Sequence, residues 1–214
     1  MSSFAGPTGV LHFFYMIKHP DQRVGIFIDT QNMYYSARFT FGKKVNFGNI
    51  VKDAVGERKL IRAVAYVVKT KTAEETPFFE ALEKLGIELR EKDLMEYFSG
   101  QKKADWDVGL TVDVIRMLDM LDVVVLVSGD GDYLPLVEYI KNRGRIVEVI
   151  AFRETTSTRL FDAADNYVNL SDDPKRYLIA AGKTDKDEIL SKEDSFMPQN
   201  KTDHEEKRKR RLSF

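Results

Sequence analysis

The chain has 214 residues and a formal net charge of −1 at pH 7, so it fits one substantial domain with tails and is not a strongly basic nucleic-acid binder as a whole. It contains no cysteine, and its three histidines, His12, His19 and His204, all lie near the termini. Disulfide bonds and a thiolate zinc site are therefore excluded, and no histidine-based catalytic site is expected inside the domain. Any chemistry must depend on carboxylates and other oxygen ligands.

The two ends of the chain differ in character from its centre. Residues 1–22 predict an N-terminal extension, because the apolar run at 10–17 has no basic segment before it and no small-residue cleavage site after it, as a secretion signal would have. Residues 173–214 are polar and charged, which predicts a flexible tail. The basic run at 207–211 is typical of a solvated tail, with a nucleic-acid-binding arm or a nuclear signal as the alternatives. No segment is long enough to span a bilayer, so we expect no membrane partner and a cytoplasmic location.

Between these ends, residues 23–172 alternate short apolar runs with helical patterns. Strands are predicted, in chain order, at residues 24–28, 62–68, 87–90, 123–127 and 146–151. Helices are predicted from about residue 33 and at about 46–55, 76–85, 105–118, 133–142 and 157–164. This alternation indicates a three-layer α/β/α domain, Rossmann-like, around a mostly parallel five-stranded sheet in the order 3-2-1-4-5. Ligand sites of such sheets lie beyond the carboxyl ends of the strands, where the strand order reverses.

Acidic residues form three groups along the chain: Asp29 with Asn32, then Asp105, Asp107 and Asp113, and then Asp130 with Asp132. Each group has an ordinary structural explanation. Asp29 follows the first strand and would cap the next helix. The segment Ser128-Gly-Asp-Gly-Asp132 is either a turn with a helix cap or a loop whose glycines let the backbone approach a ligand. Asp105 or Asp107 would cap the helix that begins near them, and Asp113 would face solvent.

Taken together, the acidic groups indicate a metal site. In the predicted strand order, Asp29 and the pair Asp130 and Asp132 follow neighbouring strands, so their carboxylates would meet at the switch point and repel each other. A hard divalent cation removes that repulsion, and an all-oxygen ligand set favours Mg²⁺ or Mn²⁺. Such an ion can orient water, lower its pKa and stabilise attack on a phosphodiester. Trp106, the only tryptophan, is more typical of packing than of base stacking.

Three segments in this order resemble the NYN domain family, and within it the LabA-like branch. They are Gly25-Ile-Phe-Ile-Asp29-Thr-Gln-Asn32, Lys103-Ala-Asp-Trp-Asp107-Val-Gly-Leu-Thr-Val-Asp113 and Val127-Ser-Gly-Asp130-Gly-Asp132-Tyr-Leu-Pro-Leu136. The resemblance spans about residues 23–170. It implies a PIN-like fold and a metal-dependent ribonuclease.

The resemblance also assigns roles to single residues. The residues implied as catalytic and as metal ligands are Asp29, Asp107, Asp130 and Asp132. In supporting roles, Asn32 would orient a carboxylate, water or phosphate, Ser128 would cap the loop of Asp130 or bind a water, and Asp113 would be an additional member of the cluster. The central segment has two acids where many members have one, which leaves Asp105 or Asp107 as the ligand. The spacing of six residues to Asp113 favours Asp107.

The expected function is therefore a metal-dependent ribonuclease, with Mg²⁺ or Mn²⁺ as cofactor and RNA as partner. The sequence leaves open whether the chain forms a homodimer. A non-catalytic RNA-binding or protein-binding module of the same fold is the main alternative, and the near-neutral charge and the tails fit it. A phosphatase of the haloacid-dehalogenase type is a weaker alternative. Gly129-Asp-Gly-Asp132 is similar to an acidic loop of that superfamily, yet Gln31 stands where its acid/base aspartate is needed.

Overall fold

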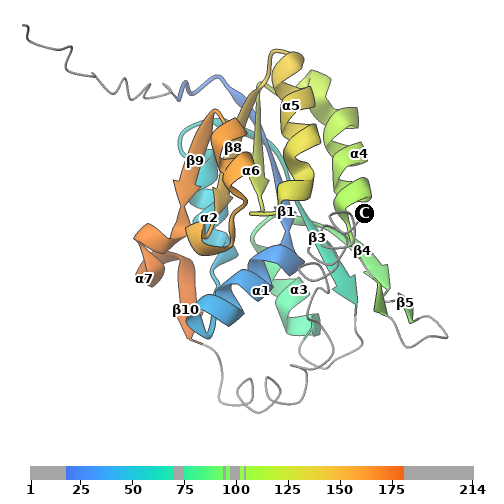
Figure 1. Ribbon diagram of the computed structural model, residues 1–214, viewed down its shortest axis with the longest axis vertical. Helices are drawn as coiled ribbons and strands as arrows, with labels where there is room; N and C mark the ends of the chain where they lie inside the picture. Colours follow the sequence, from blue (N-terminus) through green and yellow to red (C-terminus); the bar gives the residue numbers. More distant parts are fainter. Residues whose placement is uncertain (1–17, 70–74, 94, 97–101, 104, 181–214) are drawn as a thin grey trace, which may run out of the picture. The chain divides into compact units, whose positions relative to one another are not determined.

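The computed structural model describes residues 18–69, 75–93, 95–96, 102–103 and 105–180. Its centre is a six-stranded sheet in the order β4-β3-β1-β7-β8-β9, in which all neighbours are parallel (Figure 1). These strands are β1 (Arg23–Asp29), β3 (Lys59–Lys69), β4 (Glu88–Asp93), β7 (Val123–Val127), β8 (Ile146–Ala151) and β9 (Asn166–Asn169). Two small sheets pair β2 (Lys43–Val45) with β10 (Leu178–Ala180) and β5 (Met95–Glu96) with β6 (Lys102–Lys103).

The main sheet confirms the predicted fold class and the predicted order of the first five strands, and it has one strand more than the sequence predicts. The extra strand, β9, has four residues, all only half-buried, so it offers no continuous apolar run to recognise. It pairs with β8 from Glu148 opposite Asn166 to Ala151 opposite Asn169. A short edge strand of this kind is defined by its pairing partner and not by its own sequence.

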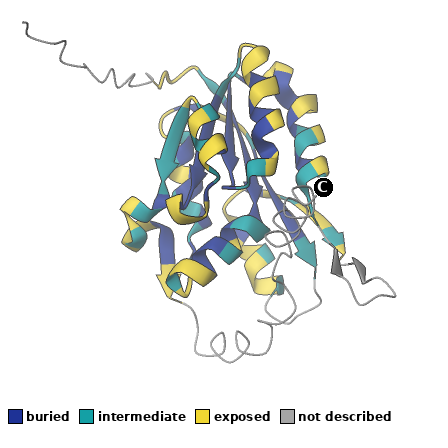
Figure 2. Ribbon diagram, viewed as in Figure 1, coloured by how far each residue is buried: buried dark blue, intermediate teal, exposed yellow. Residues whose placement is uncertain are grey.

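Helices cover both faces of the sheet and complete the three predicted layers (Figure 1). They are α1 (Thr30–Phe41), α2 (Phe47–Val55), α3 (Glu75–Lys84), α4 (Asp107–Met117), α5 (Leu134–Asn142), α6 (Thr158–Ala163) and α7 (Pro174–Tyr177), with short 3-10 turns η1 (Leu118–Met120), η2 (Gly131–Tyr133), η3 (Arg153–Thr155) and η4 (Leu170–Asp172). Buried side chains of α1, α2, α3 and α7 join one core cluster, and those of α4, α5 and α6 join another. The inner strands β1, β7 and β8 are buried on both faces, whereas the edge strands β4 and β9 are partly exposed (Figure 2).

The two central strands explain where a site can form. Every residue of β7 is buried, and its side chains alternate between the two core clusters, which is why this strand is a continuous apolar run. Strand β7 pairs with β1 in parallel up to Val127 opposite Ile28. The chain therefore leaves both strands at the same edge of the sheet, directly at Asp29 and Ser128.

The segment after Asp172, which the sequence analysis assigns to the tail, begins with α7 and β10. Arg176 forms an ion pair with Asp53 of α2, and the Tyr177 hydroxyl donates a hydrogen bond of 2.8 Å to the same carboxylate. Residues 1–17 and 181–214 lie outside the described residues, so the expectations for the extension and the remaining tail stay predictions. In the described part of the chain, no helix is long and apolar enough to cross a membrane.

Candidate metal centre

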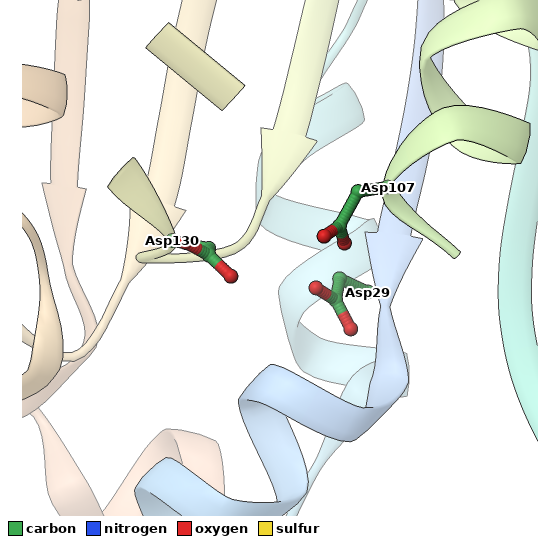
Figure 3. Close-up of side chains that lie close together, drawn as sticks. All are labelled: Asp29, Asp107 and Asp130. Atoms are coloured by element: carbon green, nitrogen blue, oxygen red, sulfur yellow. The ribbon is translucent and has the colours of Figure 1, made fainter. Parts of the chain in front are cut away.

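Three aspartates from distant parts of the sequence meet at the carboxyl edge of the sheet. Asp29 is the last residue of β1, Asp130 lies just after β7, and Asp107 is the first residue of α4. One carboxylate oxygen of each lies within 4.8 Å of those of the other two. The three carboxylates point toward a common space between β1, the loop after β7 and α4 (Figure 3). The parallel pairing of β1 with β7 produces this arrangement, because it brings their two carboxyl ends together.

Asp29 both caps α1 and faces the cluster, so the two explanations considered for it do not compete. Its Oδ1 accepts a hydrogen bond of 3.0 Å from the backbone N–H of Asn32, as a helix cap does. Its Oδ2 lies 3.4 Å from the donating hydroxyl of Ser128 and 3.3 Å from that of Tyr133. The residue is only 8% exposed, so these contacts hold the carboxylate in one orientation.

The loop after β7 is fixed by hydrogen bonds that use Ser128 and Asn32. The Ser128 hydroxyl, which is fully buried, accepts a bond of 3.2 Å from the N–H of Asp130. The side-chain carbonyl of Asn32 accepts a bond of 3.0 Å from the N–H of Gly129. Asp130 itself accepts a bond of 3.0 Å from the N–H of Asp132. Two of the three predicted supporting residues, Asn32 and Ser128, therefore hydrogen-bond to the backbone of the loop that presents Asp130.

The glycines of this loop are needed for contact with another part of the protein. A Cβ at Gly129 would lie 3.0 Å from the backbone of Thr155 and Thr156, and one at Gly131 would lie 2.8 Å from the hydroxyl of Ser157. The N–H of Ser157 also donates a bond of 2.9 Å to the Gly129 carbonyl. The close approach that the sequence analysis considered for a ligand is made here by residues 155–157.

Tyr133 is a member of the site that the sequence analysis does not identify. Its hydroxyl lies 3.2 Å from Asp107 Oδ1 and 3.3 Å from Asp29 Oδ2, and it can donate its single proton to one of them at a time. Burial, and then the charges of Asp29 and Asp107, raise its pKa, so the hydroxyl keeps its proton. A buried tyrosine needs a hydrogen-bond partner for its hydroxyl. A tyrosine directly after the acidic segment that ends at Asp132 is therefore the signal in the sequence that could have identified Tyr133.

Trp106 anchors the start of α4, one residue before Asp107. Its indole N–H donates a bond of 2.9 Å to the Val67 carbonyl, and its ring contacts Tyr66 edge to face with centroids 5.4 Å apart. A Cβ at Gly109 would lie 2.6 Å from this ring, so glycine leaves room for it. These contacts agree with the packing role expected for the tryptophan.

The remaining acidic candidates lie outside the group of three. Asp113 accepts a hydrogen bond of 3.3 Å from the Tyr66 hydroxyl and pairs with Arg90 at 3.3 Å, so its charge is already balanced elsewhere. The side chain of Asp132 is exposed. Asp105 lines the same cleft as the cluster, but the geometry places Asp107, not Asp105, among the three close carboxylates.

The electrostatics of the cluster favour a bound cation. Burial raises the pKa of Asp29 to about 6, and the charges of Asp107 and Asp130 add to this effect. Burial and then the charge of Asp130 raise the pKa of Asp107. Among the described residues, no lysine or arginine forms an ion pair with any of the three. Close carboxylates without a positive partner fit a hard divalent ion such as Mg²⁺ or Mn²⁺, and they offer no nitrogen or sulfur for zinc.

The cluster opens into a cleft of about 340 Å³. Its other walls are formed by α1, by the residues before α4 and by the loop that follows β8. The lining residues are Asp29, Gln31, Asn32, Tyr35, Ser36, Phe39, Asp105, Trp106, Asp107, Asp130 and Thr155. This volume lies near the lower end of the usual range for ligand sites, about 300–1,000 Å³.

Comparison with known proteins identifies the family. A relative, the low amplitude and bright protein LabA of Synechococcus elongatus, is 27% identical over 162 residues, which cover 70% of this chain and 84% of LabA. A solved structure of a protein of unknown function, VPA0982 from Vibrio parahaemolyticus, is 33% identical with a TM-score of 0.69, and covers 77% of this chain and 100% of that one. Residues 23–171 match the family described as NYN domain. That match spans more than half of the sequence and confirms the resemblance of the three acidic segments, so the chain belongs to the NYN domain family.

Proposed function

We propose that this NYN domain is a metal-dependent ribonuclease that hydrolyses a phosphodiester bond in the cleft at the carboxyl edge of the sheet. The observation that carries the proposal is the group formed by Asp29, Asp107 and Asp130, with oxygens within 4.8 Å of one another. Three close carboxylates, one of them almost fully buried, are costly for a fold unless they serve a ligand. Membership of the NYN family supports the same conclusion.

In this proposal each residue of the site has a defined task. Asp29, Asp107 and Asp130 are the residues that would hold Mg²⁺ or Mn²⁺, which, when bound, would lower the pKa of water and offset charge on the phosphate. Tyr133 and Ser128 orient the carboxylate of Asp29 through their hydroxyls.

The other predicted residues take different places in the proposal. Asn32 fixes the loop that carries Asp130 through the N–H of Gly129. Asp132, exposed beside Asp130, would accept hydrogen bonds from water at the edge of the site. Asp113 takes no part in hydrolysis, because its carboxylate is paired with Arg90 and Arg116.

The test is cleavage of labelled single-stranded RNA by the full chain in Mn²⁺, in Mg²⁺ and in EDTA. We compare the wild type with Asp130→Asn and with the matched control Asp119→Asn, whose side chain is 88% exposed in η1. Cleavage should require the ion, persist in Asp119→Asn, and fall more than about 100-fold in Asp130→Asn, since even outer partners of metal ligands contribute about 10- to 100-fold.

Two other results would change the conclusion. Cleavage that continues in EDTA or in Asp130→Asn would mean that the aspartate cluster is not the catalytic centre. RNA binding without turnover in any metal ion would favour the non-catalytic module of the same fold.

A further inference from the structure

Helix α1 presents two stacked aromatic rings in the same cleft as the aspartates. Tyr35 and Phe39, which we call the aromatic pair, lie four residues apart and so on one face of the helix. Their ring centroids are 5.8 Å apart and their planes differ by 19°. Phe39 is 68% exposed. Such a large apolar side chain contributes little to the core from this position, and because it lines the cleft its ring is accessible to a ligand there.

The aromatic pair lies on the helix that begins at the metal centre and lines the same cleft. Both rings line the cleft that contains Asp29, Asp107 and Asp130. Helix α1 begins directly after Asp29, and each of its residues advances about 1.5 Å along the axis. Tyr35 and Phe39 therefore lie about 9 and 15 Å along the helix from Asp29. At about 3.4 Å per nucleotide of a stacked strand, this corresponds to three or four nucleotides.

The charge of the cleft makes stacking the main contact available to RNA there. Four carboxylates line the cleft, those of Asp29, Asp105, Asp107 and Asp130, and no lysine or arginine is among the described residues that line it. Phosphates of the strand therefore find no basic partner among the described lining residues. An aromatic face attracts any nucleobase without regard to charge, because every base has a flat π surface.

Trp106 lines the cleft too, but its ring is already engaged. Tyr66 contacts it edge to face, Gly109 packs against it, and the Lys92 ammonium lies 5.5 Å from its centroid. Phe39, in contrast, keeps most of its surface exposed. Among the described rings, Phe39 of the aromatic pair is thus the best placed to receive a base.

We propose that the aromatic pair is a base-stacking subsite that receives an unpaired base of a single-stranded RNA, a few nucleotides from the bond held at the aspartate cluster. The proposal rests on the ribonuclease function proposed above and specifies how its substrate is held. The bases of a duplex are stacked on one another and paired, so their faces are not available to Phe39. The subsite therefore selects single strands over duplexes.

The experiment uses Trp106 as a reporter, because it is the only tryptophan of the chain and it lines the cleft. Binding far from the cleft would not change its fluorescence directly. All proteins carry Asp130→Asn so that the RNA stays intact, and all titrations contain Mg²⁺. The probes are an unstructured single-stranded RNA, an abasic strand of the same length, and an RNA duplex. The variants are Phe39→Leu, which keeps an apolar side chain without a ring, and Phe39→Tyr, which keeps the ring.

The matched control is Phe78→Leu, on α3 and outside the cleft, where Phe78 is 37% exposed. Single-stranded RNA should change the Trp106 fluorescence, with affinity about 5- to 100-fold lower in Phe39→Leu and restored in Phe39→Tyr, the range expected for one stacked base. The abasic strand and the duplex should bind the parent protein as weakly as single-stranded RNA binds Phe39→Leu. Thermal unfolding checks that each variant is folded.

Three results would overturn the subsite. They are equal affinity of Phe39→Leu and its parent, equal affinity for abasic and base-bearing strands, and no response of Trp106 to single-stranded RNA. Failure of the subsite is distinct from failure of the ribonuclease. Metal-dependent cleavage that is unchanged in an otherwise wild-type Phe39→Leu chain would leave the nuclease without this subsite, whereas Phe39-dependent binding without cleavage would leave an RNA-binding module.

Discussion

At the scale of single residues, Asp29 bears the largest electrostatic cost of the site. It is almost fully buried beside two other carboxylates, and its pKa is raised from 3.8 to about 6. In the unfolded chain the same group ionises at its ordinary pKa. Between these two values the folded protein binds more protons than the unfolded chain, so its stability falls as the pH rises from about 4 to about 6 and stays lower above that.

This cost predicts that Asp29→Asn stabilises the metal-free protein at neutral pH. Asparagine caps a helix as well as aspartate does, so α1 keeps its cap while the buried charge is removed. At about 1.4 kcal/mol per pKa unit, we expect the free energy of unfolding at pH 7 to rise by about 1–3 kcal/mol. At pH 4 the gain should vanish, because wild-type Asp29 is then already protonated in the folded state.

Urea unfolding in EDTA at pH 4 and pH 7 measures both values. A loss of stability in Asp29→Asn at pH 7 would contradict this prediction. It would show that attractive contacts of the Asp29 carboxylate outweigh the cost of burying its charge. Added Mn²⁺ should stabilise the wild type more than the variant, because only the wild type has all three carboxylates.

Residue roles were predictable to different degrees. Asp29 and Asp130 follow from strand ends, and Asp107 follows from the resemblance to the NYN family and its spacing to Asp113. The structure brings these three together. The partners of Asp113 are not predictable from spacing, because Arg90 reaches it from the neighbouring strand β4. The contact of Tyr133 with Asp107 is not predictable from the sequence, because its hydroxyl meets Asp107 only through the docking of α4.

At the scale of elements, the loop after β7 has to keep its glycines to hold Asp130 in place. The backbone of Thr155 and Thr156 leaves no room for a side chain at position 129. We expect Gly129→Ala to lower the free energy of unfolding by about 1–3 kcal/mol, the usual effect of overpacking, and to reduce metal-dependent cleavage as well.

Gly48→Ala is the matched control for this prediction. Its new Cβ would lie 3.2 Å from a terminal carbon of Leu85, a half-exposed and flexible side chain, and at an ordinary contact distance of 3.5 Å from Asn46 Oδ1. Urea unfolding and the RNA cleavage assay should both place Gly48→Ala close to the wild type. Equal behaviour of the two glycine variants would show that contact with residues 155–157 does not position the loop.

Some helices and strands can be located from their own sequence, and others cannot. The strands β1 and β7 could be located from continuous apolar runs, because burial on both faces imposes that pattern. Strand β9 could not, since it lies at the edge and has no fully buried residue. The sequence predicts that helix α4 begins near Asp105, two residues early, because Asp105 and Asp107 are both acceptable near a helix start.

At the scale of the whole fold, the two ends of the sheet serve different purposes. The amino ends of the strands are joined by balanced ion pairs, such as Arg23 with Asp122 at 2.7 Å and the buried pair Arg58 with Glu148 at 2.9 Å. The carboxyl end collects Asp29, Asp107 and Asp130 with no described cation to balance them. Charges at the amino end are thus paired within the protein, whereas the three aspartates at the carboxyl end form no ion pair with a described lysine or arginine.

The sequence was sufficient to predict the acidic end of the sheet because strand order decides it. Once the apolar runs are arranged as 3-2-1-4-5, the residues that follow the first and fourth runs must meet. The side-chain network that fixes their geometry was not predictable, because Ser128, Asn32 and Tyr133 act across elements more than 90 residues apart.

The central claim is that these three aspartates hold a divalent cation, and the most direct measurement is anomalous X-ray scattering from crystals soaked in Mn²⁺. We predict a single strong peak bounded by the carboxylates of Asp29, Asp107 and Asp130, and its loss in crystals of Asp130→Asn. Mn²⁺ that binds elsewhere on the protein and leaves the space between these carboxylates empty would contradict the account.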